Sequence, residues 1–191
     1  MSCLLISVNR LESTMSLNAV PLGKNAPESV NVIIEIAADS GPVKYEVCKE
    51  SATLHVDRFL STPMSYPAHY GFVPDTLCED GDPLDVLVVA PFDLVPGCVI
   101  ECRPVGVLKM EDEKGEDSKL LAVPVSGITS LYDQVTDIAD LPSVLINKVQ
   151  YFFEHYKDLE PGKWVKVTGF EGAASARQEV INAMTLYKQT S

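Results

Sequence analysis

The chain has 191 residues, of which 46% are hydrophobic and 22% are charged, and its formal net charge is −12. This length and composition are typical of one globular domain with its own core. The acidity argues against nucleic acid as the main partner, because phosphate backbones bind basic surfaces, and no uncharged apolar run reaches the roughly 18 residues that a membrane helix needs.

The first 14 residues differ in character from the rest of the chain. They contain a short apolar patch and one arginine but no cleavage-site pattern, which makes them a poor secretory signal. Met15 is an alternative start. We therefore expect residues 1–14 to be an extension, either disordered or an artefact of the chosen start, with a vestigial transit peptide as the alternative, and residues 15–191 to form a single domain.

Short apolar or alternating runs, broken by proline, glycine and acidic turns, predict β-strands through residues 29–170. The predicted strands are residues 32–36, 44–48, 53–59, 84–90, 99–108, 120–125 and 164–170. Alternation in the third strand puts Arg58 on the same face as Leu54 and Val56. An arginine there either snorkels at a sheet edge or reaches a ligand, and the local sequence favours neither.

Two helices are predicted near the end of the chain. Asp140-Leu141-Pro142 is a helix start signal, and Pro161-Gly162 ends the segment. Its apolar face contains Leu145, Val149, Phe152, Phe153 and Tyr156. The second helix covers residues 171–188, with Ala173, Ala176, Val180, Met184 and Tyr187 on one face. Many short strands and two late helices predict a mainly β (α+β) fold, a small closed or partly closed barrel with flanking helices.

Five cysteines, without a CxxC pair or zinc-like spacing, predict reduced thiols in a reducing compartment, hence a cytoplasmic protein.

The acidic stretch at residues 79–85 is the sharpest chemical pattern. Asp80 and Asp82 are two apart and face the same way in an extended segment, and Gly81 permits a bend that brings in Asp85. Three convergent carboxylates are hard oxygen ligands for Mg²⁺. A solvated acidic loop is the alternative. A calcium-binding loop fits poorly, because Pro91 stands where that motif needs glutamate.

A second acidic segment, residues 111–117, has the pattern of a β-hairpin turn with Gly115 at its tip. Asp112, Glu113 and Asp117 are either a solvated turn or the second half of a multi-metal site, and Lys119 comes next on the returning strand.

Residues 66–72 form an unusually aromatic loop, in which Tyr66 and Tyr70 either pack in the core or point phenol groups at a ligand. Tyr156 is in phase with the apolar helix face, and Lys157 could simply complement the helix dipole. We assign no catalytic role to the histidines at 55, 69 and 155.

Seven motifs together resemble those of the soluble inorganic pyrophosphatases, in family order and from about residue 17 to the end. They are Lys44-Tyr45-Glu46, Val56-Asp57-Arg58-Phe59, Tyr66-Pro67-x-x-Tyr70-Gly71, Gly81-Asp82-Pro83-Leu84-Asp85-Val86-Leu87-Val88 with Asp80 before it, Arg103-Pro104-Val105-Gly106, Gly115-Glu116-Asp117-x-Lys119 and Phe153-x-His155-Tyr156-Lys157. The departures are peripheral: the residues before Met15, Ala37 where proline is usual, and two cysteines at 98 and 102.

The resemblance implies a five-stranded barrel of oligonucleotide-binding type with extra β-hairpins and two C-terminal helices packed alongside. It implies hydrolysis of pyrophosphate to two phosphates by attack of a metal-bound water or hydroxide, with several Mg²⁺ ions and Asp82 as general base. The implied metal ligands are Asp80, Asp85, Asp117, Asp112, Glu35 and Glu46. The implied phosphate-binding residues are Lys44, Arg58, Tyr70, Lys119, Tyr156 and Lys157, with Tyr66 and Glu113 in support.

By the same resemblance we expect a homohexamer. Two rival interpretations are kept: a metal-dependent phosphatase or nucleotide pyrophosphatase acting on larger phosphate esters, and a non-catalytic barrel that binds a polyanion or divalent ions. Neither nucleic acid nor membrane is an expected partner.

Overall fold

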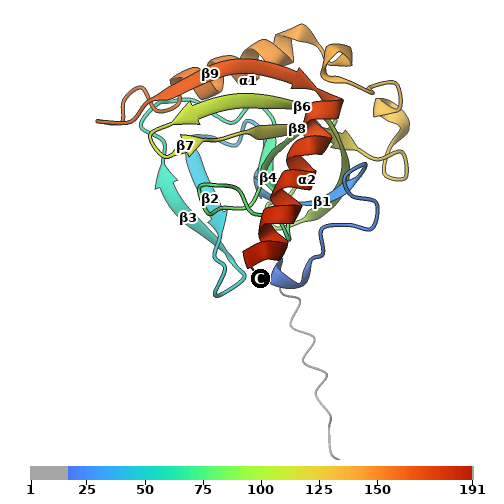
Figure 1. Ribbon diagram of the computed structural model, residues 1–191. Coiled ribbons are helices and arrows are strands. Elements are labelled where there is room, and N and C mark those ends of the chain that lie inside the picture. The colour runs from blue at the N-terminus through green and yellow to red at the C-terminus, as the bar shows by residue number, and fades with distance from the viewer. Residues whose placement is uncertain (1–16, 191) are drawn as a thin grey trace, which may run out of the picture.

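Five strands close into a ring at the centre of the computed structural model, which describes residues 17–190 (Figure 1). They are β1 (Val30–Ile36), β4 (His69–Phe72), β5 (Asp85–Val88), β6 (Val99–Asp112) and β8 (Lys119–Pro124). They pair in the order β1-β4-β5-β8-β6, and β6 returns to β1. Every pair in the ring is antiparallel except β5–β8, which is parallel. The predicted barrel of oligonucleotide-binding type is confirmed.

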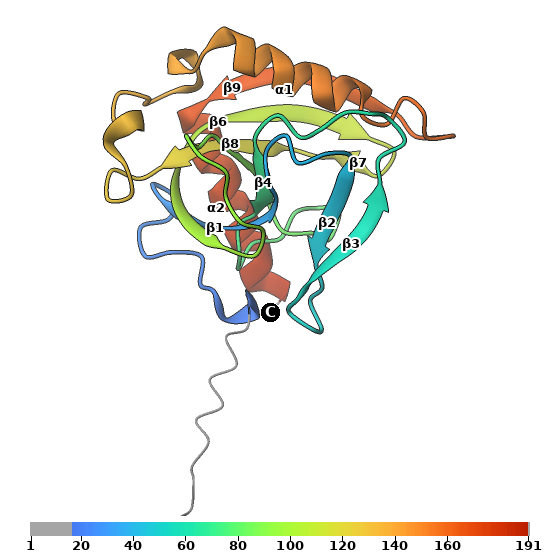
Figure 2. The same ribbon diagram turned by 180° about the vertical axis from the view of Figure 1, so that it is seen from behind.

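Further strands extend the barrel on two sides. β2 (Val43–Val47) and β3 (Leu54–Phe59) form a separate two-stranded sheet, which lies beside the barrel in Figure 2. β7 (Gly115–Glu116) and β9 (Val165–Gly172) both pair with the long strand β6. The turn between β6 and β7 therefore projects from the barrel as the predicted acidic hairpin.

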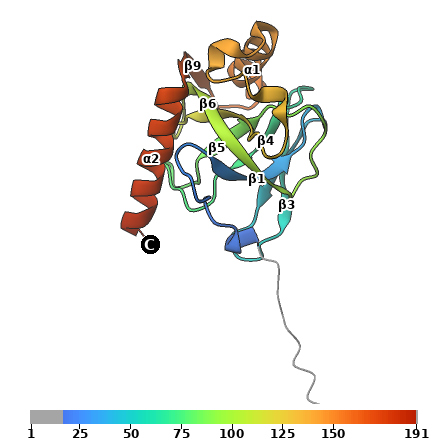
Figure 3. The same cartoon turned by 90° about the vertical axis from the view of Figure 1, so that its right-hand side faces the viewer.

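Two helices cover the barrel, as the sequence predicts. α1 (Ser143–His155) begins directly after Pro142 and packs against β9, while α2 (Ala173–Thr190) runs along β6 (Figure 3). The 3-10 helices are η1 (Leu17–Ala19), η2 (Ser130–Tyr132) and η3 (Ile138–Asp140). Among the described residues, no helix combines the length and apolar character needed to span a membrane.

Two apolar clusters make up the core, and successive residues of a strand belong to them alternately. Leu121 and Leu87 join one cluster with the apolar face of α1, whereas Leu120 and Val86 join the other with α2. Burial on both faces explains why β5 and β8 are nearly continuous apolar runs rather than alternating ones.

Three sequence expectations need correction. The sequence predicts a loop at residues 66–72, but His69–Phe72 is β4, because its backbone pairs with both β1 and β5. β6 extends to Asp112, four residues beyond the expected end, because β7, β8 and β9 all pair with it. The face that Arg58 shares with Val56 is not a core face, since Val56 is 54% exposed.

Two other expectations concern the cysteines and the N-terminal extension. The four described cysteines, Cys48, Cys78, Cys98 and Cys102, are free thiols. The prediction about residues 1–14 lies outside the described residues.

Candidate active site

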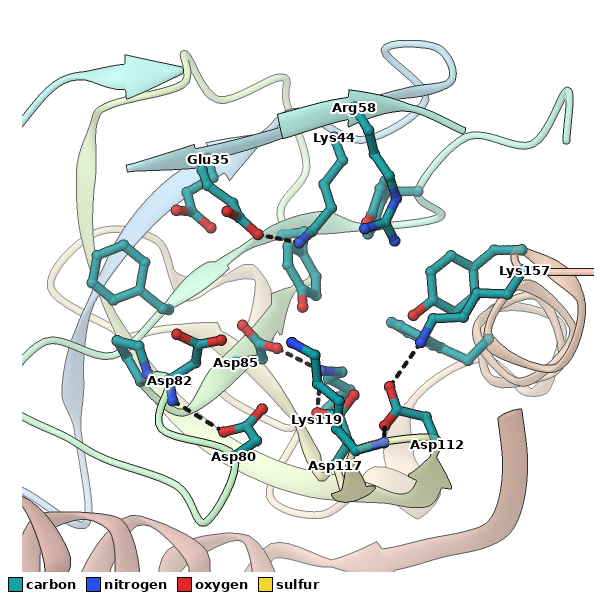
Figure 4. Close-up of a pocket in the computed structure, with 18 of the residues that line it drawn as sticks. Glu35, Lys44, Arg58, Asp80, Asp82, Asp85, Asp112, Asp117, Lys119 and Lys157 are labelled. Carbon is teal, nitrogen blue, oxygen red and sulfur yellow. Dashed lines mark hydrogen bonds and ion pairs between the residues drawn. The ribbon is translucent and has the colours of Figure 1, made fainter. Parts of the chain in front are cut away.

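One pocket of about 250 Å³ brings together every site residue proposed from the sequence (Figure 4). These residues are Glu35, Lys44, Glu46, Arg58, Tyr66, Tyr70, Asp80, Asp82, Asp85, Asp112, Glu113, Asp117, Lys119, Tyr156 and Lys157. They come from β1, β2, β3, β4, β5, β6, β8, the acidic loops and the end of α1. Acidic groups far apart in the sequence therefore share one cavity.

The loop before β5 carries Asp80 and Asp82 on a tight turn. The Cys78 N–H donates to the Asp82 carbonyl at 2.8 Å, and the Asp82 N–H donates to Asp80 Oδ1 at 3.1 Å. Gly81 adopts φ = 89°, a left-handed conformation that a residue with a side chain rarely takes. The segment is thus a turn and not the extended stretch that the spacing of Asp80 and Asp82 predicts, and the bend that Gly81 permits lies between these two carboxylates.

Lys119 lies between two carboxylates of different strands. Its ammonium group donates to Asp85 on β5 and to Asp117 before β8, and its side chain is almost fully buried. Burial alone would lower the pKa of Lys119, but the two carboxylates outweigh it and raise that pKa well above its usual value. Burial raises the pKa of Asp117. The pocket thus holds a buried cation against closely spaced acids.

The acidic hairpin faces the end of α1. Lys157 Nζ lies 2.7 Å from Asp112 Oδ2 and 3.2 Å from Glu113 Oε2. The Lys114 N–H donates to Asp112 Oδ1 at 2.7 Å. Burial opposes ionisation of Asp112, yet the Lys157 and Lys114 hydrogen bonds lower its pKa below the usual range. Lys157 is therefore a buried pocket residue, not a solvated dipole partner.

The β2–β3 sheet supplies the opposite wall, from which Lys44 and Arg58 point into the pocket in Figure 4. Lys44 Nζ pairs with Glu46 and lies 3.2 Å from Asp57 Oδ2. Arg58 is the cross-strand partner of Lys44, so the two side chains lie on the same face of the sheet. Of the two interpretations left open for Arg58, contact with a ligand fits its position better than snorkelling.

Glu35 and the two tyrosines form the buried side of the pocket. Desolvation raises the pKa of Glu35 to about 8, although the Val47 N–H donates to its carboxylate at 2.6 Å. Burial also raises the pKa of Tyr66 and Tyr70, which keeps both phenols neutral and able to donate. Both tyrosines belong to the core cluster and also line the pocket. Core packing and a phenol group pointing at a ligand, the two interpretations of the aromatic segment, are therefore compatible.

The pocket has further lining residues that the sequence reasoning missed. They are Val47, Lys49, Phe72, Pro83, Lys114, Phe153 and Lys163. Lys49 Nζ lies 3.4 Å from Asp82 Oδ1, and Lys163 Nζ lies 3.8 Å from Glu113 Oε1. Lys49 could have been found from its position directly after the predicted strand 44–48, which already carried Lys44 and Glu46. No such signal marks Lys163, which follows Pro161-Gly162.

Histidine plays no part in this pocket. The Ala38 N–H donates to His69 Nδ1 at 3.1 Å, so His69 Nε2 carries the proton and donates to the Phe92 carbonyl at 3.1 Å. His155 pairs with Asp158 on the surface. His69 thus links the backbone of two loops, and His155 makes a surface ion pair.

The donor set suits a hard divalent cation. Eight carboxylates line the pocket, and all their donor atoms are oxygens, the ligands that Mg²⁺ takes. Their crowding contributes to the raised pKa values of Glu35 and Asp117, which a bound cation would lower. Within residues 17–190, no three acidic, histidine or cysteine side chains are already grouped as a metal site, and the Lys119 ammonium pairs with both Asp85 and Asp117. The chemistry of the donor atoms nevertheless fits a divalent cation such as Mg²⁺.

Comparisons with known proteins agree on one family. A family model described as inorganic pyrophosphatase matches residues 32–188. The chain is 57% identical over 175 residues to an inorganic pyrophosphatase of Yersinia pestis, covering 92% of this chain and 100% of that protein. It is 58% identical over 167 residues to the Escherichia coli K12 protein of the same name, covering 87% and 95%.

Solved structures of other proteins are also similar to the structure of this chain. A structure described as inorganic phosphatase from Anaplasma phagocytophilum superposes with a TM-score of 0.87 at 50% identity, covering 88% of this chain and 99% of that one. The inorganic pyrophosphatase of Thermus thermophilus gives a TM-score of 0.85 at 44% identity, covering 91% and 99%.

Proposed function

The chain belongs to the family I inorganic pyrophosphatases, enzymes that hydrolyse pyrophosphate with a divalent metal, and from this premise we propose a Mg²⁺-dependent mechanism with named residue roles. The observation that carries the proposal is the single pocket that gathers all fifteen predicted residues. Eight carboxylates and several lysine and arginine side chains line this pocket together, which suits a metal-bound polyanion.

The cations of the pocket bind the two phosphoryl groups. Lys44 and Arg58 approach from the β2–β3 sheet, and Lys119 and Lys157 approach from the barrel and α1. Their charge stabilises the negative charge that builds on the departing phosphate. Tyr70 and Tyr156, buried and neutral, donate hydrogen bonds to phosphate oxygens, while Tyr66 and Glu113 hold this arrangement in place.

Asp82 is the general base. Its side chain is 59% exposed, and its nearest described partner is Lys49, so it can accept a proton from a water that approaches the phosphorus. Bound Mg²⁺ would lower the pKa of that water and neutralise charge on the substrate. The role of Asp82 is to receive the proton as the P–O bond to the water forms and the bridging P–O bond breaks, which releases two phosphates.

Six acidic residues are proposed to hold the metal ions. Asp80, Asp85 and Asp117 form the primary set, Asp112 joins Asp117 in a second group, and Glu35 and Glu46 act through water. What supports this division is position: the first four lie at the ends of barrel strands or in the acidic loops, whereas Glu35 and Glu46 lie on the β1 and β2 side.

Phosphate release from pyrophosphate tests the proposal. The purified protein should be inactive after treatment with EDTA and should regain activity on titration with Mg²⁺. ATP and sugar phosphates, assayed in parallel, should give at most a small fraction of this rate. Metal-independent turnover would reject the Mg²⁺ mechanism, and faster hydrolysis of the esters would favour a broader phosphatase activity.

Three further expectations stay predictions. They are a single domain over residues 15–191, a homohexamer and a cytoplasmic location. Light scattering after size exclusion measures the second directly.

A further inference from the structure

An unbroken series of ion pairs runs beside the pocket, and its second member, Glu160, has no role in the proposed mechanism. Glu160 Oε1 lies 3.6 Å from Arg58 Nε, and Glu160 Oε2 lies 3.4 Å from Lys163 Nζ. Lys163 Nζ in turn lies 3.8 Å from Glu113 Oε1, and Glu113 pairs with Lys157. Cations and anions therefore alternate between β3 and the end of α1.

The contact between Arg58 and Glu160 is buried and incomplete. Arg58 Nε and Glu160 Oε1 are both inaccessible to solvent, and within residues 17–190 neither atom has a hydrogen-bond partner. The Glu160 side chain is only 12% exposed. Leaving a buried N–H donor and a buried carboxylate oxygen unsatisfied is unfavourable. A shift of well under 1 Å would close the gap to a normal hydrogen bond.

Closing this gap would orient the guanidinium group. Nε lies at one edge of the planar fork, so anchoring it leaves the two terminal nitrogens to bind a phosphate side by side. The competing anchor is Asp57, whose Oδ2 lies 3.4 Å from Arg58 Nη1 and so takes up a terminal nitrogen. Glu160, in the turn after α1, is thus the residue that can hold Arg58 without using the atoms that face the substrate.

We propose that Glu160 is a positioning residue that fixes Arg58, and through it the β2–β3 sheet, in the orientation that binds phosphate. This inference rests on the proposed function, because it assumes that Arg58 contacts the substrate. A phosphate bound by the two terminal nitrogens would leave Nε to Glu160, which would then accept the Nε–H hydrogen bond.

The test is a double-mutant cycle with Glu160→Ala, Arg58→Ala and the combined variant. For each we would measure kcat and KM for pyrophosphate with Mg²⁺, and binding of methylenediphosphonate, a pyrophosphate analogue that is not hydrolysed. Glu160→Ala should reduce kcat/KM by roughly 10- to 100-fold, the loss expected from a misplaced binding group, and should weaken analogue binding. In the Arg58→Ala background, Glu160→Ala should change kcat/KM less than about twofold, since it would act through Arg58.

Two further variants separate positioning from general stability. Glu28→Gln is a control for removing the charge of a glutamate that lies near an arginine Nε, because Glu28 Oε2 lies 3.7 Å from Arg177 Nε outside the pocket, in a pair that is more exposed than the one between Glu160 and Arg58. It should leave kcat/KM unchanged. Glu160→Gln, which keeps the shape and one acceptor oxygen, should retain more activity than Glu160→Ala, and it serves as the test variant if the alanine variant does not fold.

The outcomes separate failure of the positioning role from failure of the proposed function. If Arg58→Ala lowers kcat/KM but Glu160→Ala and Glu160→Gln do not, the positioning role of Glu160 is rejected while the proposed function stands. Independent, multiplying effects in the combined variant would reject it as well. If Arg58→Ala itself leaves kcat/KM unchanged, the phosphate-binding role of Arg58 fails, and the inference about Glu160 fails with it.

Discussion

Lys157 Nζ lies 2.7 Å from Asp112 Oδ2, and both side chains are less than a tenth exposed. The pair joins the end of α1 to the acidic hairpin of β6 and β7, and its two residues are separated by 45 positions in the chain. A buried ion pair contributes little net stability when both charges are present, but removing one partner leaves an uncompensated charge. Removing one member of this pair should therefore affect both the stability of the fold and the pocket.

Lys157→Met should lower the free energy of unfolding by about 3 kcal/mol, the lower end of the loss expected when one partner of a buried pair is removed. The combined Asp112→Asn/Lys157→Met variant should recover part of this stability, because the uncompensated carboxylate is gone. It should not recover pyrophosphate hydrolysis, since both proposed site groups are missing. Urea unfolding and phosphate release measure the two effects. Recovery of activity together with stability would show that Lys157 serves only the fold.

Asp82→Asn should keep the fold and lower kcat by roughly 10²- to 10⁴-fold, the usual contribution of a general base. The fold is expected to survive because the side chain is exposed and its one described ion pair, with Lys49, is a surface pair worth little. Asp93→Asn, an exposed carboxylate outside the pocket, is the control. Near-normal turnover of folded Asp82→Asn would remove Asp82 from the mechanism.

Asp85→Ala should weaken activation by Mg²⁺ more than Glu35→Ala. Asp85 faces Lys119 and the Asp117 side of the pocket, where its loss removes a proposed direct ligand. Glu35 has a pKa raised to about 8 by burial and already accepts the Val47 N–H, so it is the weaker candidate for direct coordination. Mg²⁺ activation curves should show the half-activating concentration rising by roughly tenfold or more for Asp85→Ala. Coincident curves would contradict a central role for Asp85.

The sequence predicts the site better than it predicts the strands that position it. Spacing in residues 80–85 and 112–119 leaves a metal site and a solvated acidic turn both open, and the full set of site residues comes from the resemblance to the soluble inorganic pyrophosphatases. Residues 66–72 are misleading because Pro67 and Gly71 are typical of loops, whereas His69–Phe72 is held as a strand by pairing with β1 and β5.

Glu160 escapes sequence reasoning for a related reason. Its partners, Arg58 and Lys163, meet it through the turn after α1, and one of them lies on β3, far earlier in the chain. The hydrophobic periodicity of a single segment does not predict a contact between residues so far apart in the chain. Local chemistry is therefore readable from the sequence, and long-range pairing is not.

Gly71→Ala tests how tightly β1 and β4 approach next to the site. A Cβ atom at Gly71 would lie 1.9 Å from the carbonyl oxygen of Ile33, and backbone cannot yield as a flexible side chain does. The variant should lose about 3 kcal/mol or more of unfolding free energy, at the upper end of the range for overpacked cores. It should also lower activity, since the neighbouring Tyr70 lines the pocket. Gly127→Ala, where a Cβ would meet no described atom within 4 Å, is the matched control and should unfold like the wild type. Equal stability of the two variants would mean that the β1–β4 pairing is looser than the structure indicates.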